Sequence, residues 1–416
     1  NRFLQSEFQP IRITVDYYNI ENFSGISSTY VSNTKKIVDA AVELFTKIVK
    51  VRPLSLPIKV QRCNVGVDFD IKDEIKNDGV QTDLLLFAVI DDDPATRDTV
   101  EGWATFCYQD TTTNRPVVGV IGLSRVAVTF TRDNWLEYYT YLLFHEIIHV
   151  LGFNESLYAE FYDASRDNSI PKGEVLIEGA NINGLPRNLI KTPNVMEAAR
   201  NHFDCSSILG VELENQGGSG SAGSHWESRV MLGDIMIAVS YDELFLSGIT
   251  CAFLEDTGWY QIDCYNGGLF KFGKNKGCDF VAEKCIQNQQ TPFSNQFCHI
   301  NRQNLCMVGD KSKGICSIKS QTGNQGDEIQ EETHYQYFGN DSTGGFYFAD
   351  FCPVVNSFTD SARFFSGSCI NGLATLPPEM QESISNNSGC LMSNLINTSI
   401  NDQTKLDIKL PVCYKY

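Results

Sequence analysis

The chain has 416 residues and a net charge of −18, with 33 lysines and arginines against 51 acidic residues. Its length allows two or three domains with a large core. The acidity excludes nucleic acid and anionic membrane surfaces as expected partners. No apolar run reaches the roughly 18 residues that a transmembrane helix needs, so we expect no membrane-spanning segment.

The cysteines are concentrated in the last part of the chain. Eleven of the 14 lie between Cys251 and Cys413, which predicts a disulfide scaffold formed in an oxidising compartment. Five N-x-S/T triplets also favour the secretory pathway, and these candidate glycosylation sites are Asn22, Asn154, Asn340, Asn386 and Asn397. We therefore expect a mature extracellular or cell-surface protein. A lipid-anchored surface form is an alternative, because the C-terminal signal for such an anchor is removed when the lipid is attached.

The first third of the chain predicts strands around one helix. Residues 34–50 have apolar side chains at helical spacing, with Asn33 as the expected N-cap. The expected strands are IRITVDY from Ile11, PIKVQRC at 57–63, TDLLLFAVI ending at Ile90, GWATFCYQ at 102–109 and PVVGVIGLS at 116–124. The apolar run before Ile90 is typical of a strand that is buried on both faces. This order predicts one α/β layer of mostly parallel strands covered by helices.

A second helix is predicted at 135–151. Asn134 opens a capping-box pattern, and Gly152 fits a left-handed position just after the helix end. The helix is apolar on every side, which indicates that it is buried. It nevertheless contains His145, Glu146 and His149, and buried polar groups require a specific reason.

That reason is metal chemistry. His145 and His149 are four residues apart, so both imidazoles project from one helix face towards one site. Glu146 is rotated by about 100° from His145, close enough to reach a metal-bound water without binding the metal. Zinc lowers the pKa of such a water, and the glutamate takes its proton during attack on a peptide carbonyl.

Two histidines do not complete a zinc site, so a third ligand is required. In the HExxHxxG pattern that ends at Gly152, the third histidine follows three residues later, but this chain has Glu155 there. The residues leave several candidates open, namely Glu155, Glu174, Glu178, His202 and His225. We favour His225, which follows the glycine-rich stretch 216–224 and precedes Met236, a methionine placed as in a Met-turn.

These motifs together resemble the leishmanolysin family of surface metalloproteases, which are metzincins. The resemblance rests on GWATFC and RPVVGVI before the site, HEIIHVLGF at it, ENQGGSGSAGSHW at the distant histidine, EDTGWYQ after it, and YQYF and DFCPVV further on. In this family a long insertion separates the glycine from the third histidine. The resemblance implies that His145, His149 and His225 bind one Zn²⁺, that Glu146 is the catalytic acid/base and that Met236 forms the Met-turn.

The resemblance also implies the architecture. We expect an α/β metzincin domain with a mostly parallel twisted sheet at 1–153, a mixed middle domain at 154–262, and a disulfide-rich, loop-rich domain at 263–416. It further suggests the disulfide pairs Cys63–Cys107 and Cys205–Cys278.

The predicted function is a zinc endopeptidase whose protein substrates bind in extended form along the edge strand at Gly102–Cys107. The competing prediction is a catalytically silent surface or secreted glycoprotein with a structural or adhesive role.

Overall fold

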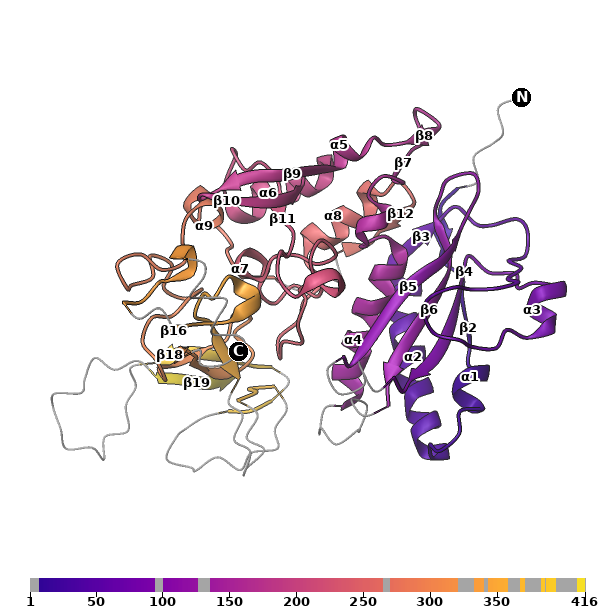
Figure 1. Ribbon diagram of the computed structural model, residues 1–416. Coiled ribbons are helices and arrows are strands. Elements are labelled where there is room, and N and C mark those ends of the chain that lie inside the picture. The colour runs from indigo at the N-terminus through magenta and orange to yellow at the C-terminus, as the bar shows by residue number, and fades with distance from the viewer. Residues whose placement is uncertain are drawn as a thin grey trace.

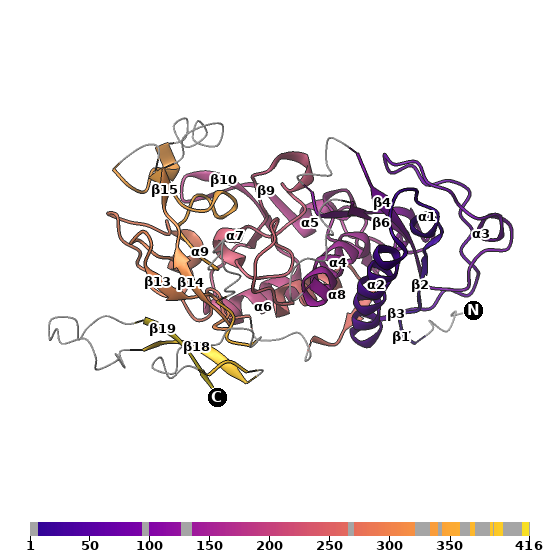
Figure 2. The same cartoon turned by 90° about the horizontal axis from the view of Figure 1, so that it is seen from below.

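The computed structural model describes residues 7–93, 100–125, 135–264, 270–320, 333–339, 343–357, 367–370, 383–385, 387–393 and 410–415. Two views place the N-terminal and C-terminal parts at opposite ends, with residues 154–262 between them (Figures 1 and 2). Asn134 and the candidate glycosylation sites Asn340, Asn386 and Asn397 lie outside the described residues. No helix of the described residues is long and apolar enough to cross a membrane.

A four-stranded sheet forms the N-terminal part. Its strands are β2 (Ile13–Asp16), β4 (Leu84–Asp91), β5 (Gly102–Gln109) and β6 (Pro116–Ser124). They lie in the order β2-β4-β6-β5. The pairings of β4 with β2 and with β6 are parallel, whereas β5 is antiparallel to β6 and forms one edge. The mostly parallel character follows the prediction, and the antiparallel edge is the new element.

Both faces of this sheet are covered, which explains the apolar runs of β4 and β6. Helices α2 (Ser28–Ile48) and α4 (Trp135–Leu151) pack on one face, where Leu86 and Ile121 join the main core. On the other face, Phe87 and Val120 pack against Ile58 in a second core. The prediction of a strand at 57–63 is wrong. That segment covers the sheet face and forms only a single bridge, between Ile58 and Val80.

The start of the first long helix also differs from the prediction. Helix α2 begins at Ser28, and the side chain of Ser27 accepts a hydrogen bond from the N–H of Tyr30. Asn33 is therefore inside the helix, because Ser27 supplies the N-terminal cap one and a half turns earlier. The helix ends at Ile48 and the chain continues directly into β3 (Val49–Val51), which pairs with β1 (Gln9–Pro10) and β12 (Tyr260–Ile262). Two short helices, α1 (Tyr18–Glu21) and α3 (Asp73–Asn77), complete this part.

The middle part contains an antiparallel sheet and two packed helices. Its sheet has the order β11-β10-β9, formed by β9 (Leu176–Ile182), β10 (Leu185–Ile190) and β11 (Val211–Glu212). Helix α6 (Pro193–Phe203) packs against α8 (Gly248–Asp256). The shorter elements are η1 (Glu155–Leu157), β7 (Tyr162–Asp163), β8 (Asn168–Ser169), α5 (Lys172–Val175), η2 (Gly218–Gly220) and α7 (Ser228–Met231).

The C-terminal part is built from short elements joined by disulfides. These elements are α9 (Cys278–Ala282), β13 (Asn304–Cys306), β14 (Lys313–Cys316), β15 (Lys319–Ser320), η4 (Thr333–Tyr335), β16 (Thr343–Gly344), η5 (Tyr347–Ala349), β17 (Val355–Ser357), β18 (Ser388–Ser393) and β19 (Leu410–Lys415). The cysteines form the pairs 63–107, 205–278, 251–264, 285–352, 298–316, 306–390 and 369–413. The first two are the pairs that the resemblance suggested. Seven disulfides fit an oxidising compartment.

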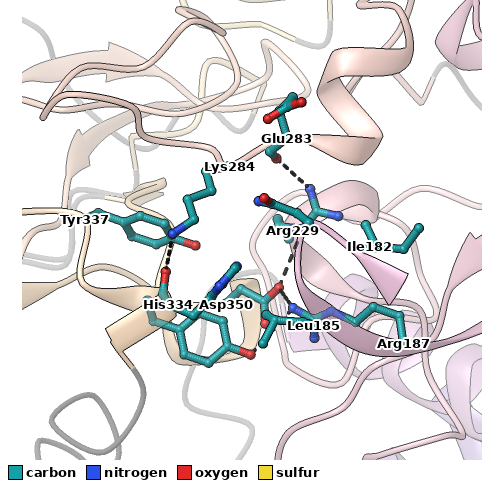
Figure 3. Close-up of a pocket in the computed structure, with 11 residues that line it drawn as sticks. Ile182, Leu185, Arg187, Arg229, Glu283, Lys284, His334, Tyr337 and Asp350 are labelled. Carbon is teal, nitrogen blue, oxygen red and sulfur yellow. Dashed lines mark hydrogen bonds and ion pairs between the residues drawn. The ribbon is translucent and has the colours of Figure 1, made fainter. Parts of the chain in front are cut away.

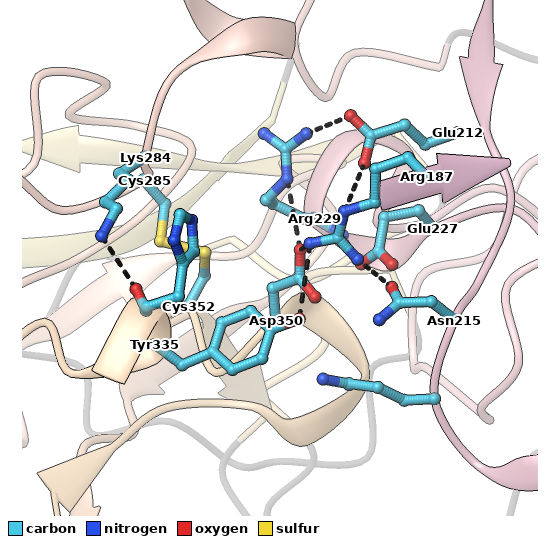
Figure 4. Close-up of polar contacts among 12 residues, drawn as sticks. Arg187, Glu212, Asn215, Glu227, Arg229, Lys284, Cys285, Tyr335, Asp350 and Cys352 are labelled. Carbon is cyan, nitrogen blue, oxygen red and sulfur yellow. Dashed lines mark hydrogen bonds and ion pairs between the residues drawn. A yellow bond between two sulfur atoms is a disulfide. The ribbon is translucent and has the colours of Figure 1, made fainter. Parts of the chain in front are cut away.

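A buried ionic network joins the middle part to the C-terminal part (Figure 4). Asp350, which follows η5, contacts Arg187 of β10 at 2.5 Å and Arg229 of α7 at 3.5 Å. Both arginines also pair with Glu212 of β11, and no side chain of the four is more than 6 % exposed. A cavity of about 10 Å³ lies beside the two arginines and Asp350, and Tyr337 contributes to its lining (Figure 3). Buried guanidinium groups need such carboxylate partners, so the network ties the two parts together.

Replacing the shared carboxylate tests this interpretation. The Asp350→Ala change leaves two buried guanidiniums with one acid fewer, and we expect it to lower the free energy of unfolding by about 3–5 kcal/mol. Denaturant titration with the disulfides intact measures the change. Glu174→Ala is the control, because it removes a half-exposed partner of Arg166 and should cost less than about 1 kcal/mol. Equal losses in the two variants would contradict a special role for the buried network.

Candidate metal centre

Three histidine side chains from two distant segments meet at one point. His145 and His149 lie one turn apart on α4, and His225 follows η2 in the sequence. Their Nε2 atoms are separated by 3.0 Å for His145 and His149, 3.1 Å for His149 and His225, and 3.2 Å for His225 and His145. Among the described residues, this is the one group of three or more potential metal-binding side chains whose ligand atoms lie within 4.8 Å of one another.

The other nitrogen of each ring determines which way the imidazole faces. Each Nδ1 lies at hydrogen-bond distance from a main-chain carbonyl, which can only accept a proton. These carbonyls belong to Ile235 for His145 at 2.5 Å, to Phe153 for His149 at 2.7 Å and to Ser221 for His225 at 2.9 Å. Each Nδ1 therefore carries the proton, and the three unprotonated Nε2 atoms direct their lone pairs at one another.

This arrangement fits a bound metal ion. Three facing lone pairs have no proton between them, and a cation placed among them would satisfy all three together. Nitrogens about 2.0–2.1 Å from a tetrahedral zinc lie about 3.3 Å apart, close to the observed 3.0–3.2 Å.

Burial keeps the imidazoles in their neutral, metal-binding form. It lowers the pKa of His145 to about 3, with the neighbouring His149 acting in the same direction. Burial likewise lowers the pKa of His149 to about 4 and that of His225 well below its ordinary value. The site is therefore prepared to bind a cation without first losing protons at neutral pH.

Glu146 lies on α4 beside the edge strand β5. It is 5 % exposed, and the nearby main-chain N–H of Ala104 favours its charged form. Its Oε1 also lies 3.7 Å from the position that a Cβ would occupy at Gly102. Burial raises the pKa of the Glu146 carboxyl to about 8. A cation held by the three imidazoles would lower that pKa, because a nearby positive charge favours the carboxylate.

The other candidates for the third ligand lie in different surroundings. Glu174 pairs with Arg166 at 3.1 Å, and Glu178 pairs with Lys172 at 2.9 Å. His202 directs Nε2 to the carbonyl of Phe272 at 2.7 Å.

Glu155 is exposed and lies beside a glycine near the centre. Its Oε2 is 2.9 Å from the position that a Cβ would occupy at Gly223, which has a φ of +78°. The positive φ favours glycine at this turn, whereas the carboxylate end of the exposed Glu155 side chain could move aside.

Gly152 and Met236 are the two further residues near the centre that the sequence singled out. Gly152 follows the last residue of α4 and has a positive φ of +155°, as predicted, although this value is far from that of a left-handed helix. A Cβ there would lie 3.2 Å from the side chain of Thr257, so close packing with the segment after α8 also favours glycine. Met236 is completely buried, and its carbonyl accepts a hydrogen bond from the N–H of Trp226.

Comparison with known proteins assigns the chain to a family. A family model described as leishmanolysin matches residues 30–416. The chain belongs to the leishmanolysin family.

Individual relatives agree over most of the chain. A leishmanolysin of Leishmania donovani is 28 % identical over 388 residues, which cover 87 % of this chain and 60 % of that protein. For a leishmanolysin of Leishmania tropica the identity is 28 % over 338 residues, covering 79 % and 47 %. A leishmanolysin-like peptidase of Caenorhabditis elegans is 25 % identical over an alignment of 452 residues, covering 85 % and 66 %. The chain thus spans between about half and two thirds of the length of these relatives.

Sequence reasoning missed the groups that orient the site. The three main-chain carbonyls and the N–H of Ala104 carry no sequence signal, because every residue except proline has both groups. Asp234, two residues before Met236, was also missed, although an acid in a run as apolar as GDIMIAV is an indication of a buried role.

Metal analysis tests the composition of the cluster. We expect one divalent ion per chain, measured by elemental analysis after dialysis against trace metal. His225→Ala should abolish stoichiometric binding, because it leaves only the two ligands on α4. His202→Ala is the control and should keep the ion. Loss of metal in the His202 variant, or full retention in the His225 variant, would show that the ligand set is wrong.

Proposed function

We propose that this protein is a zinc-dependent endopeptidase. The observation that supports the proposal best is the set of three histidine Nε2 atoms that lie 3.0–3.2 Å apart. Glu146 is buried on α4, the helix that carries two of these histidines. Three neutral imidazoles favour zinc and leave a fourth position for water or substrate. Leishmanolysin and leishmanolysin-like peptidase are the names of the relatives, which agrees with peptide-bond hydrolysis.

The residues of the chain have separate roles in this reaction. Zinc held by His145, His149 and His225 would lower the pKa of a bound water and polarise the peptide carbonyl. Glu146 takes a proton from the attacking water on its carboxylate and delivers it to the leaving amine. The nearby N–H of Ala104 favours the charged form of this carboxylate, which is the form that accepts the proton.

The open edge of β5 is suited to holding the substrate. The N–H of Ser124 donates to the carbonyl of Glu101 at 3.1 Å, so Glu101, Trp103 and Thr105 bond to β6, up to the register shift after Phe106. The main-chain groups of Gly102 and Ala104 therefore point away from the sheet, on the side where Glu146 lies. An extended peptide that adds to this edge would place its main chain beside the general base.

We also propose the division into domains at 1–153, 154–262 and 263–416, with passage through the secretory pathway. The seven disulfides and the exposed position of Asn22 support that passage. Strand β12, at the end of the middle segment, pairs with β3, so the first two proposed domains share a sheet.

Glu146→Gln tests the catalytic role. The amide has the shape of the carboxylate but cannot take a proton, so activity on casein should fall by at least about 100-fold while zinc content and fold are kept. The comparison uses wild-type protein loaded with the same zinc. Activity within about tenfold of wild type would exclude Glu146 as the base. A zinc-loaded wild type that cleaves nothing would favour the competing prediction of a silent glycoprotein.

Cleavage of a peptide library tests the binding mode. Main-chain pairing reads no side chain, so we expect varied sequences to be cut, provided that they are extended. The pocket just past the cut should favour an apolar residue, since α4 and the segment around Met236 are both rich in apolar residues. Mass spectrometry of the products reports both properties. Strict selection for a charged residue directly after the cut, or cleavage of folded loops alone, would contradict this binding mode.

A further inference from the structure

A carboxylate that no part of the proposed reaction uses lies buried behind the metal centre. Asp234 has no exposed surface, and both of its oxygens have donors. Oδ1 accepts from the N–H of Met236 at 2.7 Å, and Oδ2 accepts from the N–H of Ser247 at 3.3 Å. The hydroxyl of Thr250 lies 2.9 Å from Oδ1 and 2.8 Å from Oδ2. This side chain therefore joins the turn at 234–236 to the first turn of α8.

The turn that Asp234 holds is in contact with two segments that carry metal ligands. The carbonyl of Ile235 accepts from Nδ1 of His145 at 2.5 Å. The next carbonyl, that of Met236, accepts from the N–H of Trp226 at 2.9 Å. Trp226 follows His225 directly. The carbonyl of Ile235 therefore orients His145 on α4, and the next carbonyl holds the residue beside His225, which is 80 residues from His145 in the sequence.

Thr250 extends the same network to the indole of Trp226. Its Oγ1 accepts from Nε1 of Trp226 at 2.8 Å while its proton is donated to Asp234. Trp226 and Thr250 are both completely buried. Asp234 is thus linked to the segment of His225 twice, through the main chain of Met236 and through Thr250.

We propose that Asp234 is a positioning residue that sets the geometry of the metal ligands His145 and His225 through the turn at 234–236. It acts without touching metal or substrate. The proposal rests on the proposed function, because it requires that the three histidines bind a metal ion. Ligand orientation by such outer contacts affects metal affinity directly.

Four variants separate this role from general stability. Asp234→Asn keeps the shape but turns an NH₂ group towards one of the two main-chain donors. Thr250→Val removes the hydroxyl and keeps the volume, and Thr250→Ser restores the hydroxyl. Asp256→Asn is the matched control, since Asp256 also accepts from two main-chain N–H groups, those of Asn194 at 3.2 Å and Val195 at 2.9 Å. That acid lies at the other end of α8 and caps α6.

The measurement is zinc affinity by competition with a chelator, with the absorption spectrum of the cobalt-substituted protein as a second readout. We expect Asp234→Asn and Thr250→Val to weaken zinc binding by about 10- to 100-fold and to change the cobalt spectrum. Thr250→Ser and Asp256→Asn should stay within about threefold of wild type, although Asp256→Asn lowers the thermal midpoint. If Asp234→Asn does not fold, the two Thr250 variants carry the comparison.

Two results would overturn the proposal while the zinc site stands. One is wild-type zinc affinity in both Asp234→Asn and Thr250→Val. The other is an equal loss of affinity in Asp256→Asn, which would show that any buried acid near α8 matters alike. A wild-type protein that binds no zinc would instead overturn the proposed function, and the role of Asp234 with it.

Discussion

Three hydrogen bonds from imidazole Nδ1 atoms to main-chain carbonyls are the constraint on which the rest of this structure depends. They force the unprotonated Nε2 atoms of His145, His149 and His225 to face one another at 3.0–3.2 Å in a buried place. Such an arrangement is unfavourable by itself, because each lone pair loses its water and gains no donor. The same arrangement is the one that a metal ion could bind, because the scaffold already holds three unprotonated nitrogens at one point.

Several parts of the chain surround α4, the helix that carries His145, Glu146 and His149. The central sheet and α2 pack against α4 and bury it. The edge strand β5 reaches Glu146 with the N–H of Ala104. The turn at 234–236 supplies the carbonyl for His145, and the glycine-rich segment before His225 supplies the carbonyl of Ser221. Each of these groups comes from a different part of the chain, so the site exists only in the folded protein.

The buried ionic network extends this dependence to the C-terminal part. Glu212 pairs with Arg229 and, through its main-chain carbonyl, accepts from the N–H of Glu227, two residues after His225. Asp350 completes the charges on the other side. The segment that contains His225 thus contacts the other two histidines on one side and the buried ionic network on the other. Removing one partner from such a network leaves an uncompensated buried charge, so its members act together.

The sequence by itself determined the local part of this protein. The spacing of His145, Glu146 and His149, the apolar helix around them and the apolar runs of β4 and β6 follow from side-chain periodicity, which acts over a few residues. The cysteine distribution likewise indicated a disulfide scaffold.

The segment at 57–63 was mispredicted because a stretch that covers a sheet face has the same apolar content as a strand. The start of α2 was misplaced because Ser27 and Asn33 are both good caps, and packing selects between them. Only the tertiary structure decided which of five candidates joins His145 and His149, that β5 is an antiparallel edge beside Glu146, and that Asp234 accepts hydrogen bonds within the turn at 234–236. These facts depend on contacts between residues far apart in the chain and on main-chain groups, which are the same for nearly every residue and leave no pattern in the sequence.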